Sequence, residues 1–245
     1  MKILGLDSSG LVASVAVVED DILLAEFTTD YKKTHSQTLL PMLDEIRKMI
    51  DLDLSTVDAI AIAAGPGSFT GLRIGSATAK GLGLALNKPL VEVPTLAGLA
   101  WNLWGTDKLV CPLMDARRGQ VYSAVYEFVP NGNSMDLVEV IPQDAFDVKE
   151  LLQKINELGR EVVFLGDGVP VYRKVAEEVL TVGHSYAPAG CNRQRGACVA
   201  ALGAVYFAQG KMVPAAEHQP EYLRKSQAER EQEEKLKEAE ALANA

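Results

Sequence analysis

The chain has 245 residues, and its 24 Lys and Arg against 33 Asp and Glu give a formal net charge of −9 at pH 7. Apolar residues make up 48% and charged residues 23%, which is ordinary globular usage and excludes intrinsic disorder and a disulfide-stapled miniprotein. The acidic balance argues against free-standing nucleic-acid binding, because phosphate contacts need clustered Lys and Arg.

The first thirty residues read as three consecutive strands, at 3–6, 12–18 and 22–29. Turn-forming clusters separate them, and the second run is rich in β-branched residues. Strands joined by such short turns predict an antiparallel meander. This start disfavours a dinucleotide-binding domain, which would begin with a βαβ unit.

A helix is predicted over residues 36–50, with an apolar face that is unusually wide. Residues at helical spacing form its centre, and further apolar residues extend it to an arc of roughly 180°, which is broader than a simple core-facing stripe. The centre comprises Leu39, Leu43, Ile46 and Ile50, and the extension comprises Leu40, Met42 and Met49.

The near-continuous apolar run 57–64 predicts a buried strand, and a helix from about residue 69 to 86 follows it. That helix is rich in Gly, Ala and Ser. Glycine costs about 1 kcal/mol against alanine inside a helix, so a compensating contact is expected, and close helix–helix approach is the natural candidate.

The remaining elements predict two lobes, 1–106 and 107–225, followed by a charged helical or disordered tail at 226–245. A strand at 90–93 and a helix at 94–104 complete the first lobe. The second lobe is predicted from strands at 109–114, 120–129 and 162–165, a turn at 130–133, and helices at 148–158, 169–180 and 197–209.

The three cysteines, Cys111, Cys191 and Cys198, form no C-x-x-C pair, which indicates free thiols in a reducing compartment. No segment resembles a signal peptide, and none has the ~20 apolar residues of a membrane span. We therefore expect a soluble cytoplasmic protein with no membrane partner.

Two turns and one strand end could line a cleft. A turn follows the first strand, and a glycine-rich turn in segment 65–75 (GPGSFTGLRIG) precedes a helix N-terminus, where backbone N–H groups favour anions. Segment 65–75 matches neither a P-loop nor G-x-G-x-x-G, so tight turns closed by Asp or Ser side chains remain the alternative. The candidate nucleotide or phosphate cleft comprises Asp7, Ser8, Ser9, Gly65, Gly67, Ser68 and Asp115.

Neither a metal site nor a catalytic residue is predicted. His35, His184 and His218 lie far apart in the sequence, and none has another His or Cys at metal-ligand spacing. No G-x-S-x-G motif is present.

Four segments together resemble the bacterial TsaB (YeaZ) family. They are residues 6–9 (LDSS) leading into 14–16 (SVA), the glycine-rich segment 65–75, residues 115–122 (DARRGQVY) and residues 220–224 (PEYLR). The resemblance covers about residues 1–225, and segment 65–75 is its most specific part. It implies an α/β, two-lobed fold of the actin, sugar-kinase and Hsp70 ATPase type, with mixed sheets flanked by helices.

The resemblance also implies a role in synthesis of threonylcarbamoyladenosine in tRNA, next to the anticodon. A TsaD-like transferase would catalyse the transfer, a TsaE-like ATPase would be a further partner, and this chain would be a non-catalytic dimerisation and scaffold subunit. ATP and the metal would belong to the partner subunits, and tRNA would be contacted only through the complex. Where the transferase has histidines, after residue 93, this chain has residues 94–99 (PTLAGL), which offer no metal ligand.

The resemblance further implies pairing with the transferase, or with a second copy when the chain is alone, through the first-lobe helices. The alternative is that both helices simply cover the sheet, and we expect each to do both with opposite faces. A change of Met42 or Leu43 to Glu should then break association without unfolding the chain. The predicted interface comprises Leu39, Leu40, Met42, Leu43, Ile46, Met49, Arg73, Ser76, Ala79 and Lys80.

The rival hypothesis is an enzyme of the same fold. It would be a nucleotide-dependent enzyme or a glycoprotease-like, metal-dependent hydrolase that uses Asp7, Ser68 and Asp115 around the cleft.

Overall fold

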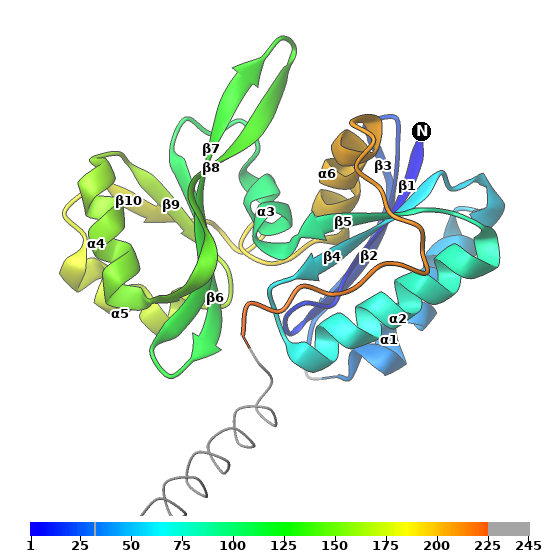
Figure 1. Ribbon diagram of the computed structural model, residues 1–245, viewed down its shortest axis with the longest axis horizontal. Coiled ribbons are helices and arrows are strands. Elements are labelled where there is room, and N and C mark those ends of the chain that lie inside the picture. Colours follow the sequence, from blue (N-terminus) through cyan, green and yellow to red (C-terminus); the bar gives the residue numbers. More distant parts are fainter. Residues whose placement is uncertain (32, 225–245) are drawn as a thin grey trace, which may run out of the picture.

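The structure, a computed structural model that describes residues 1–31 and 33–224, contains two mixed five-stranded sheets side by side (Figure 1). The strand order is β3-β2-β1-β4-β5 in the first sheet and β10-β9-β6-β7-β8 in the second. The strands of the first sheet are β1 (Lys2–Asp7), β2 (Val12–Glu19), β3 (Ile22–Asp30), β4 (Ala59–Gly65) and β5 (Leu90–Pro94). Those of the second are β6 (Leu109–Arg117), β7 (Gln120–Asn131), β8 (Ser134–Asp147), β9 (Val162–Leu165) and β10 (His184–Tyr186).

The first sheet begins as the predicted antiparallel meander. β1 pairs antiparallel with β2, and β2 with β3, whereas β4 and β5 extend the sheet in parallel. Helices α1 (His35–Met49) and α2 (Phe69–Leu86) cover one face, and α3 (Thr95–Ala100) and α6 (Gly196–Ala208) cover the other (Figure 1). Because both faces are covered, β1, β2 and β4 are almost entirely buried.

Helix α6 approaches the first sheet closely because small residues line the contact. A Cβ on Gly5 would lie 2.3 Å from the Gly196 carbonyl oxygen, and a Cβ on Gly203 would lie 2.5 Å from Ala61 Cβ. The predicted second lobe, 107–225, includes α6, yet this helix packs on the strands of the first sheet. The predicted division is corrected accordingly: the chain leaves for the second sheet at β6 and returns to the first with α6.

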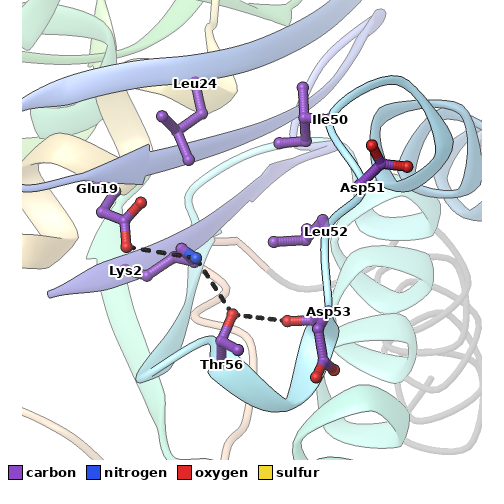
Figure 2. A pocket seen from close by; sticks show the side chains of 8 residues that line it. All are labelled: Lys2, Glu19, Leu24, Ile50, Asp51, Leu52, Asp53 and Thr56. Carbon is purple, nitrogen blue, oxygen red and sulfur yellow. Dashed lines mark hydrogen bonds and ion pairs between the residues drawn. The ribbon is translucent and has the colours of Figure 1, made fainter.

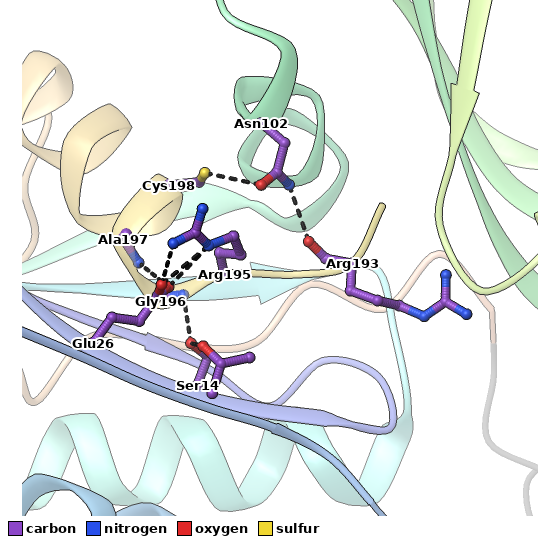
Figure 3. Close-up of polar contacts among 9 residues, drawn as sticks. Ser14, Glu26, Asn102, Arg193, Arg195, Gly196, Ala197 and Cys198 are labelled. Atoms are coloured by element: carbon purple, nitrogen blue, oxygen red, sulfur yellow. Dashed lines mark hydrogen bonds and ion pairs between the residues drawn. The ribbon is translucent and has the colours of Figure 1, made fainter. Parts of the chain in front are cut away.

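Polar contacts fix the first turn of α6 to the meander (Figure 3). The Gly196 N–H donates to Ser14 Oγ over 2.7 Å, and the Ala197 N–H donates to Glu26 Oε1 over 3.1 Å. The Arg195 guanidinium forms an ion pair with the Glu26 carboxylate. The first N–H groups of a helix have no acceptor within the helix, and here strands β2 and β3 supply the acceptors.

Helices α4 (Val148–Leu158) and α5 (Val169–Val179) pack on the second sheet. Asp147 begins α4 by accepting hydrogen bonds from the N–H groups of Lys149 and Glu150. Strands β7 and β8 form a long hairpin whose tip projects beyond the rest of the lobe (Figure 1).

After α6 the chain returns along α2, and the described residues end between the two lobes (orange in Figure 1). Residues 213–224 of this segment are called the strap. A β-bridge between Leu90 and Val213 joins the start of the strap to β5. The predicted tail, 226–245, lies outside the described residues. Among the helices of the described ranges, none is long and apolar enough to cross a membrane.

Candidate functional site

A cleft of about 570 Å³ lies between the two lobes. Four parts of the chain form most of it: the turns that begin at Ser9 and Gly67, the end of β6, and the end of the strap. Its lining comprises Ser9, Gly10, Leu11, Gly67, Ser68, Phe69, Thr70, Met114, Asp115, Ala116, Arg117, Tyr122, Asp167, Tyr222, Leu223 and Arg224.

The first-lobe wall of the cleft is a direct contact between the β1–β2 turn and the start of α2. The Ser68 N–H donates to the Ser9 carbonyl over 2.7 Å, and Ser8 Oγ donates to the Gly71 carbonyl over 2.8 Å. A Cβ on Gly67 would lie 2.3 Å from the Ser9 carbonyl oxygen, and one on Gly71 would lie 2.1 Å from that of Ser8. These glycines therefore permit packing of one turn on another, and not the helix–helix approach that the sequence favoured.

Asp7 lies beneath this wall, almost completely buried. Its Oδ1 accepts hydrogen bonds from the backbone N–H of Ser9 at 2.9 Å and from Ser9 Oγ at 2.7 Å. Burial raises the pKa of Asp7 to about 6, although the bonds from Ser9 oppose that rise. The carboxyl closes its own turn, as the structural alternative in the sequence predicted.

The second-lobe wall is organised around Asp115. The side chain accepts hydrogen bonds from the Tyr172 hydroxyl at 3.0 Å and from the Arg117 N–H at 2.8 Å. The Asp115 N–H donates to Asp167 Oδ1 at 3.2 Å. Burial raises the pKa of Asp167. Asp115 is thus held in place by an internal network that also shapes the β6–β7 turn.

The structure brings together only part of the predicted nucleotide cleft. Ser9, Gly67, Ser68 and Asp115 line it, whereas Asp7, Ser8 and Gly65 lie below its surface. At the start of α2, two backbone N–H groups are already bonded within the protein: that of Ser68 to the Ser9 carbonyl and that of Gly71 to Ser68 Oγ. In the part of the chain that the structure describes, no group of three or more His, Cys, Asp or Glu residues could hold a metal ion.

The predicted partner interface is largely buried within the chain. In α1, the side chains of Leu39, Met42, Leu43 and Ile46 pack into the core under the first sheet. The prediction that Met42 and Leu43 lie on a free face is wrong, because this part of the apolar arc of α1 faces the sheet, whereas Leu40 and Met49 of the same arc face the solvent.

Helix α2 shows the same division between buried and exposed positions. Ser76 and Ala79 are buried, and Lys80 Nζ donates to the His218 carbonyl in the strap at 3.0 Å. Arg73 is exposed, and its Nε donates to the Tyr222 hydroxyl at 3.3 Å. Of the predicted interface, Leu40, Met49 and Arg73 remain accessible.

A different face of α2 is open to solvent. Residues Ala77, Gly81, Leu84 and Ala85 are exposed and recur at helical spacing, and together they are called the outer face. Leu84 is 62% exposed, and a Cβ on Gly81 would meet nothing within 4 Å. The small residues predicted a close approach of another helix, and the outer face is the part of α2 where a helix from outside the chain has room.

Sequence reasoning missed one cluster completely. The Ser76 hydroxyl lies 2.8 Å from His218 Nε2, and His218 Nδ1 donates to Glu92 Oε1 at 2.6 Å. The order of groups is that of a serine-hydrolase relay, but Ser76 and His218 are only 5% and 1% exposed, so a substrate cannot reach the hydroxyl. The three residues come from α2, β5 and the strap, so no local motif could have revealed them.

A second, smaller cavity of about 360 Å³ lies at the far edge of the first lobe (Figure 2). Lys2 Nζ spans it, with Glu19 at 3.3 Å and Thr56 Oγ1 at 3.2 Å. The Thr56 hydroxyl in turn donates to the Asp53 carbonyl. The charged groups satisfy one another, so this cavity is a structural feature of the lobe edge.

Known proteins resemble this chain over nearly its whole length. The TsaD family model, described as tRNA N6-adenosine threonylcarbamoyltransferase, matches residues 23–232. A Bacillus subtilis (strain 168) protein named tRNA threonylcarbamoyladenosine biosynthesis protein TsaB is 36% identical over 180 residues, covering 74% of this chain and 77% of that protein. The Escherichia coli (strain K12) protein of the same name is 31% identical over 236 residues, covering 93% of this chain and 96% of that protein.

The solved structure of YeaZ from Pseudomonas aeruginosa matches with a TM-score of 0.76 at 26% identity, covering 91% of this chain and 99% of that one. This likeness, together with the two mixed sheets flanked by helices, confirms the predicted two-lobed, actin-like fold. A tRNA N6-adenosine threonylcarbamoyltransferase from Jannaschia sp. (strain CCS1) is 43% identical over a shorter region of 82 residues, which is 34% of this chain and 23% of that protein.

Proposed function

This chain belongs to the TsaB (YeaZ) family, and from that membership we propose that it is a non-catalytic subunit in the biosynthesis of threonylcarbamoyladenosine in tRNA. The observation that carries the proposal is the likeness to the Escherichia coli TsaB over 96% of that protein's length. The proposed role is to associate with a TsaD-like transferase and support its active form.

The internal bonding of the cleft supports a non-catalytic role. Asp7 and Ser68, which the rival enzyme hypothesis needs, are both engaged in closing turns: Asp7 accepts from Ser9, and Ser68 Oγ accepts from the Gly71 N–H. The Asp115 carboxylate is held by Tyr172. Asp7 is also only 1% exposed, so a substrate does not reach its carboxylate in this structure.

The outer face of α2 supports association with another protein. Leu84 projects from a stripe of small residues, and such a stripe lets a helix of a partner approach closely. We propose that a TsaD-like transferase binds there, and that a second copy of this chain occupies the same face when the transferase is absent. A TsaE-like ATPase would join the assembled pair.

The proposed division of labour places ATP and the metal ion on the partner subunits. The short stretch of likeness to a threonylcarbamoyltransferase supports a shared fold between this chain and its proposed partner. We further propose that tRNA reaches this chain only through the complex, because the formal net charge of −9 disfavours direct phosphate contacts. The site of action would be the cytoplasm.

Reconstitution tests the proposed function. The TsaD-like and TsaE-like proteins of the same organism, ATP, the threonylcarbamoyl-adenylate donor and tRNA are combined with and without this chain, and modified nucleoside is measured. Modification is expected only when the chain is present, while the chain alone gives none. Equal modification without the chain, or transfer by the chain alone, would refute the proposed role.

A further inference from the structure

We propose that the strap is a latch that links the partner-binding helix α2 to the inter-lobe cleft, and that the hydrogen-bonded series Ser76–His218–Glu92 is its catch. The link to partner binding rests on the proposed function, whereas the existence of the latch does not. Release of the catch would free the end of the strap and loosen the cleft without unfolding the first sheet.

The catch holds the middle of the strap. The His218 imidazole is buried between α2 and β5, bonded to Ser76 Oγ at 2.8 Å and to Glu92 Oε1 at 2.6 Å. Lys80 Nζ donates to the carbonyl of the same histidine. A single strap residue thus concentrates three polar contacts, so its loss removes much of what holds this part of the strap.

The strap follows α2 along most of the helix. At one end, a Cβ on Gly83 would lie 2.7 Å from Ala215 Cβ. At the other end, the Tyr222 and Phe69 rings have centroids 4.8 Å apart. Gly83 precedes Leu84 of the outer face directly. If α2 shifted when a partner bound, its contacts with the strap would therefore change over several helical turns.

The far end of the strap reaches the second lobe. The Glu221 N–H donates to the Ala64 carbonyl at 2.7 Å, and Gln143 Nε2 in β8 donates to the Glu221 carboxylate at 3.2 Å. Arg224 Nη1 donates to the Ala116 carbonyl in β6 at 2.9 Å. Because the last strap residues line the cleft, their release would change its width and lining.

The strap is built to open locally. Apart from the bridge at Val213, side chains supply most of its contacts, and Gln219 and Glu221 are exposed. The Glu92 side chain is 37% exposed, so water can reach one end of the catch. A segment with few backbone hydrogen bonds and an accessible anchor opens at a lower free energy than the sheet beneath it.

Hydrogen exchange read by mass spectrometry tests the latch on the isolated chain. His218→Asn and the milder Ser76→Ala are compared with wild type, and Gln219→Ala, which changes an exposed strap residue, is the matched control. Amides of residues 218–224 should exchange about tenfold faster in Ser76→Ala, the factor expected for losing one net hydrogen bond, and faster still in His218→Asn. Exchange should also become faster in segments 65–70 and 114–117, while the amides of β1 and β4 stay protected. The control variant should exchange at the wild-type rate throughout.

Unchanged strap exchange in Ser76→Ala, or exchange that rises equally in β1 and β4, would overturn the latch, because the first shows no catch and the second shows general unfolding. A second measurement adds the TsaD-like protein, whose binding is checked separately by size-exclusion chromatography. Binding that leaves wild-type strap exchange unaltered would refute the link to α2. If the TsaD-like protein did not bind, the proposed function would be refuted instead. The comparison of exchange in the variants and wild type would still show whether the latch exists.

Discussion

Gly71 and Ser8 are in backbone contact, since a Cβ on Gly71 would lie 2.1 Å from the Ser8 carbonyl oxygen. We expect Gly71→Ala to lower the free energy of unfolding by about 3 kcal/mol or more, because a backbone carbonyl cannot yield as a flexible side chain does. Gly81→Ala is the control in the same helix, where the space is open, and it should raise stability by about 1 kcal/mol. Urea unfolding measures both changes, and equal effects at the two positions would contradict the packing described.

Asp7 predicts a specific pH dependence of stability. Its pKa is raised to about 6 in the folded chain from 3.8, so the folded state binds the proton more tightly than the unfolded state. The protonated Asp7 therefore contributes fully to the free energy of unfolding below pH 4, and this contribution is lost as the pH rises through 6. The loss is about 3 kcal/mol. Relative to wild type, Asp7→Asn should gain stability between pH 4.5 and pH 7.5.

Asp53→Asn is the control for the Asp7 experiment. Hydrogen bonds from Ser55 lower the pKa of Asp53, so this carboxyl stabilises the fold at higher pH, where it is ionised. Its replacement should therefore reduce stability as the pH rises, opposite in sign to Asp7→Asn. Chemical denaturation at several pH values measures both, and the same sign for the two variants would contradict the account.

Buried and exposed leucines of the first-lobe helices should respond in opposite ways to a charge. Leu43 is 4% exposed, so Leu43→Glu should prevent folding, because an unpaired carboxylate would be placed in the core. Leu84 is 62% exposed, so Leu84→Glu should change stability by less than ~0.5 kcal/mol and still abolish binding to the TsaD-like protein. Circular dichroism and size-exclusion chromatography separate folding from binding. A folded Leu84→Glu chain with full binding would remove the outer face from the proposed interface.

The buried relay predicts an absence of serine-hydrolase reactivity. A fluorophosphonate probe should leave Ser76 unlabelled in the native chain, because the hydroxyl is buried against the strap. A Ser76→Ala chain is the control for labelling elsewhere. If mass spectrometry located the probe on Ser76, the strap would open widely enough for the probe to reach the hydroxyl. That result would contradict the conclusion that a substrate cannot reach Ser76.

The meander, the helix at 36–50 and the turn before α2 could be predicted because local pattern and turn chemistry both favour them. The orientation of α1 could not. A helix that lies against both a sheet and a neighbouring helix buries a wide arc, and the same arc would result from a sheet on one side and an external partner on the other. Only burial of Leu43 in the folded chain distinguishes the two.

The second lobe shows a different limit of sequence reasoning. Strand β8 (Ser134–Asp147) was not predicted, because its exposed positions and the register shifts against β7 weaken the alternation of apolar and polar residues. The strap was equally hidden, since its contacts join His218 to residues more than a hundred positions away. Long-range contacts of this kind leave no local periodicity.

The return of α6 to the first sheet has a consequence for synthesis of the chain. About 100 residues separate the end of β5 from the start of α6. At ~5–20 residues per second, the ribosome needs about 5–20 s to deliver them. The lobe that is synthesised first is thus completed last. During that interval, much of one apolar face of its sheet is not yet covered by α6. We expect nascent chains arrested before α6 to recruit chaperones, and those arrested well after the strap to release them.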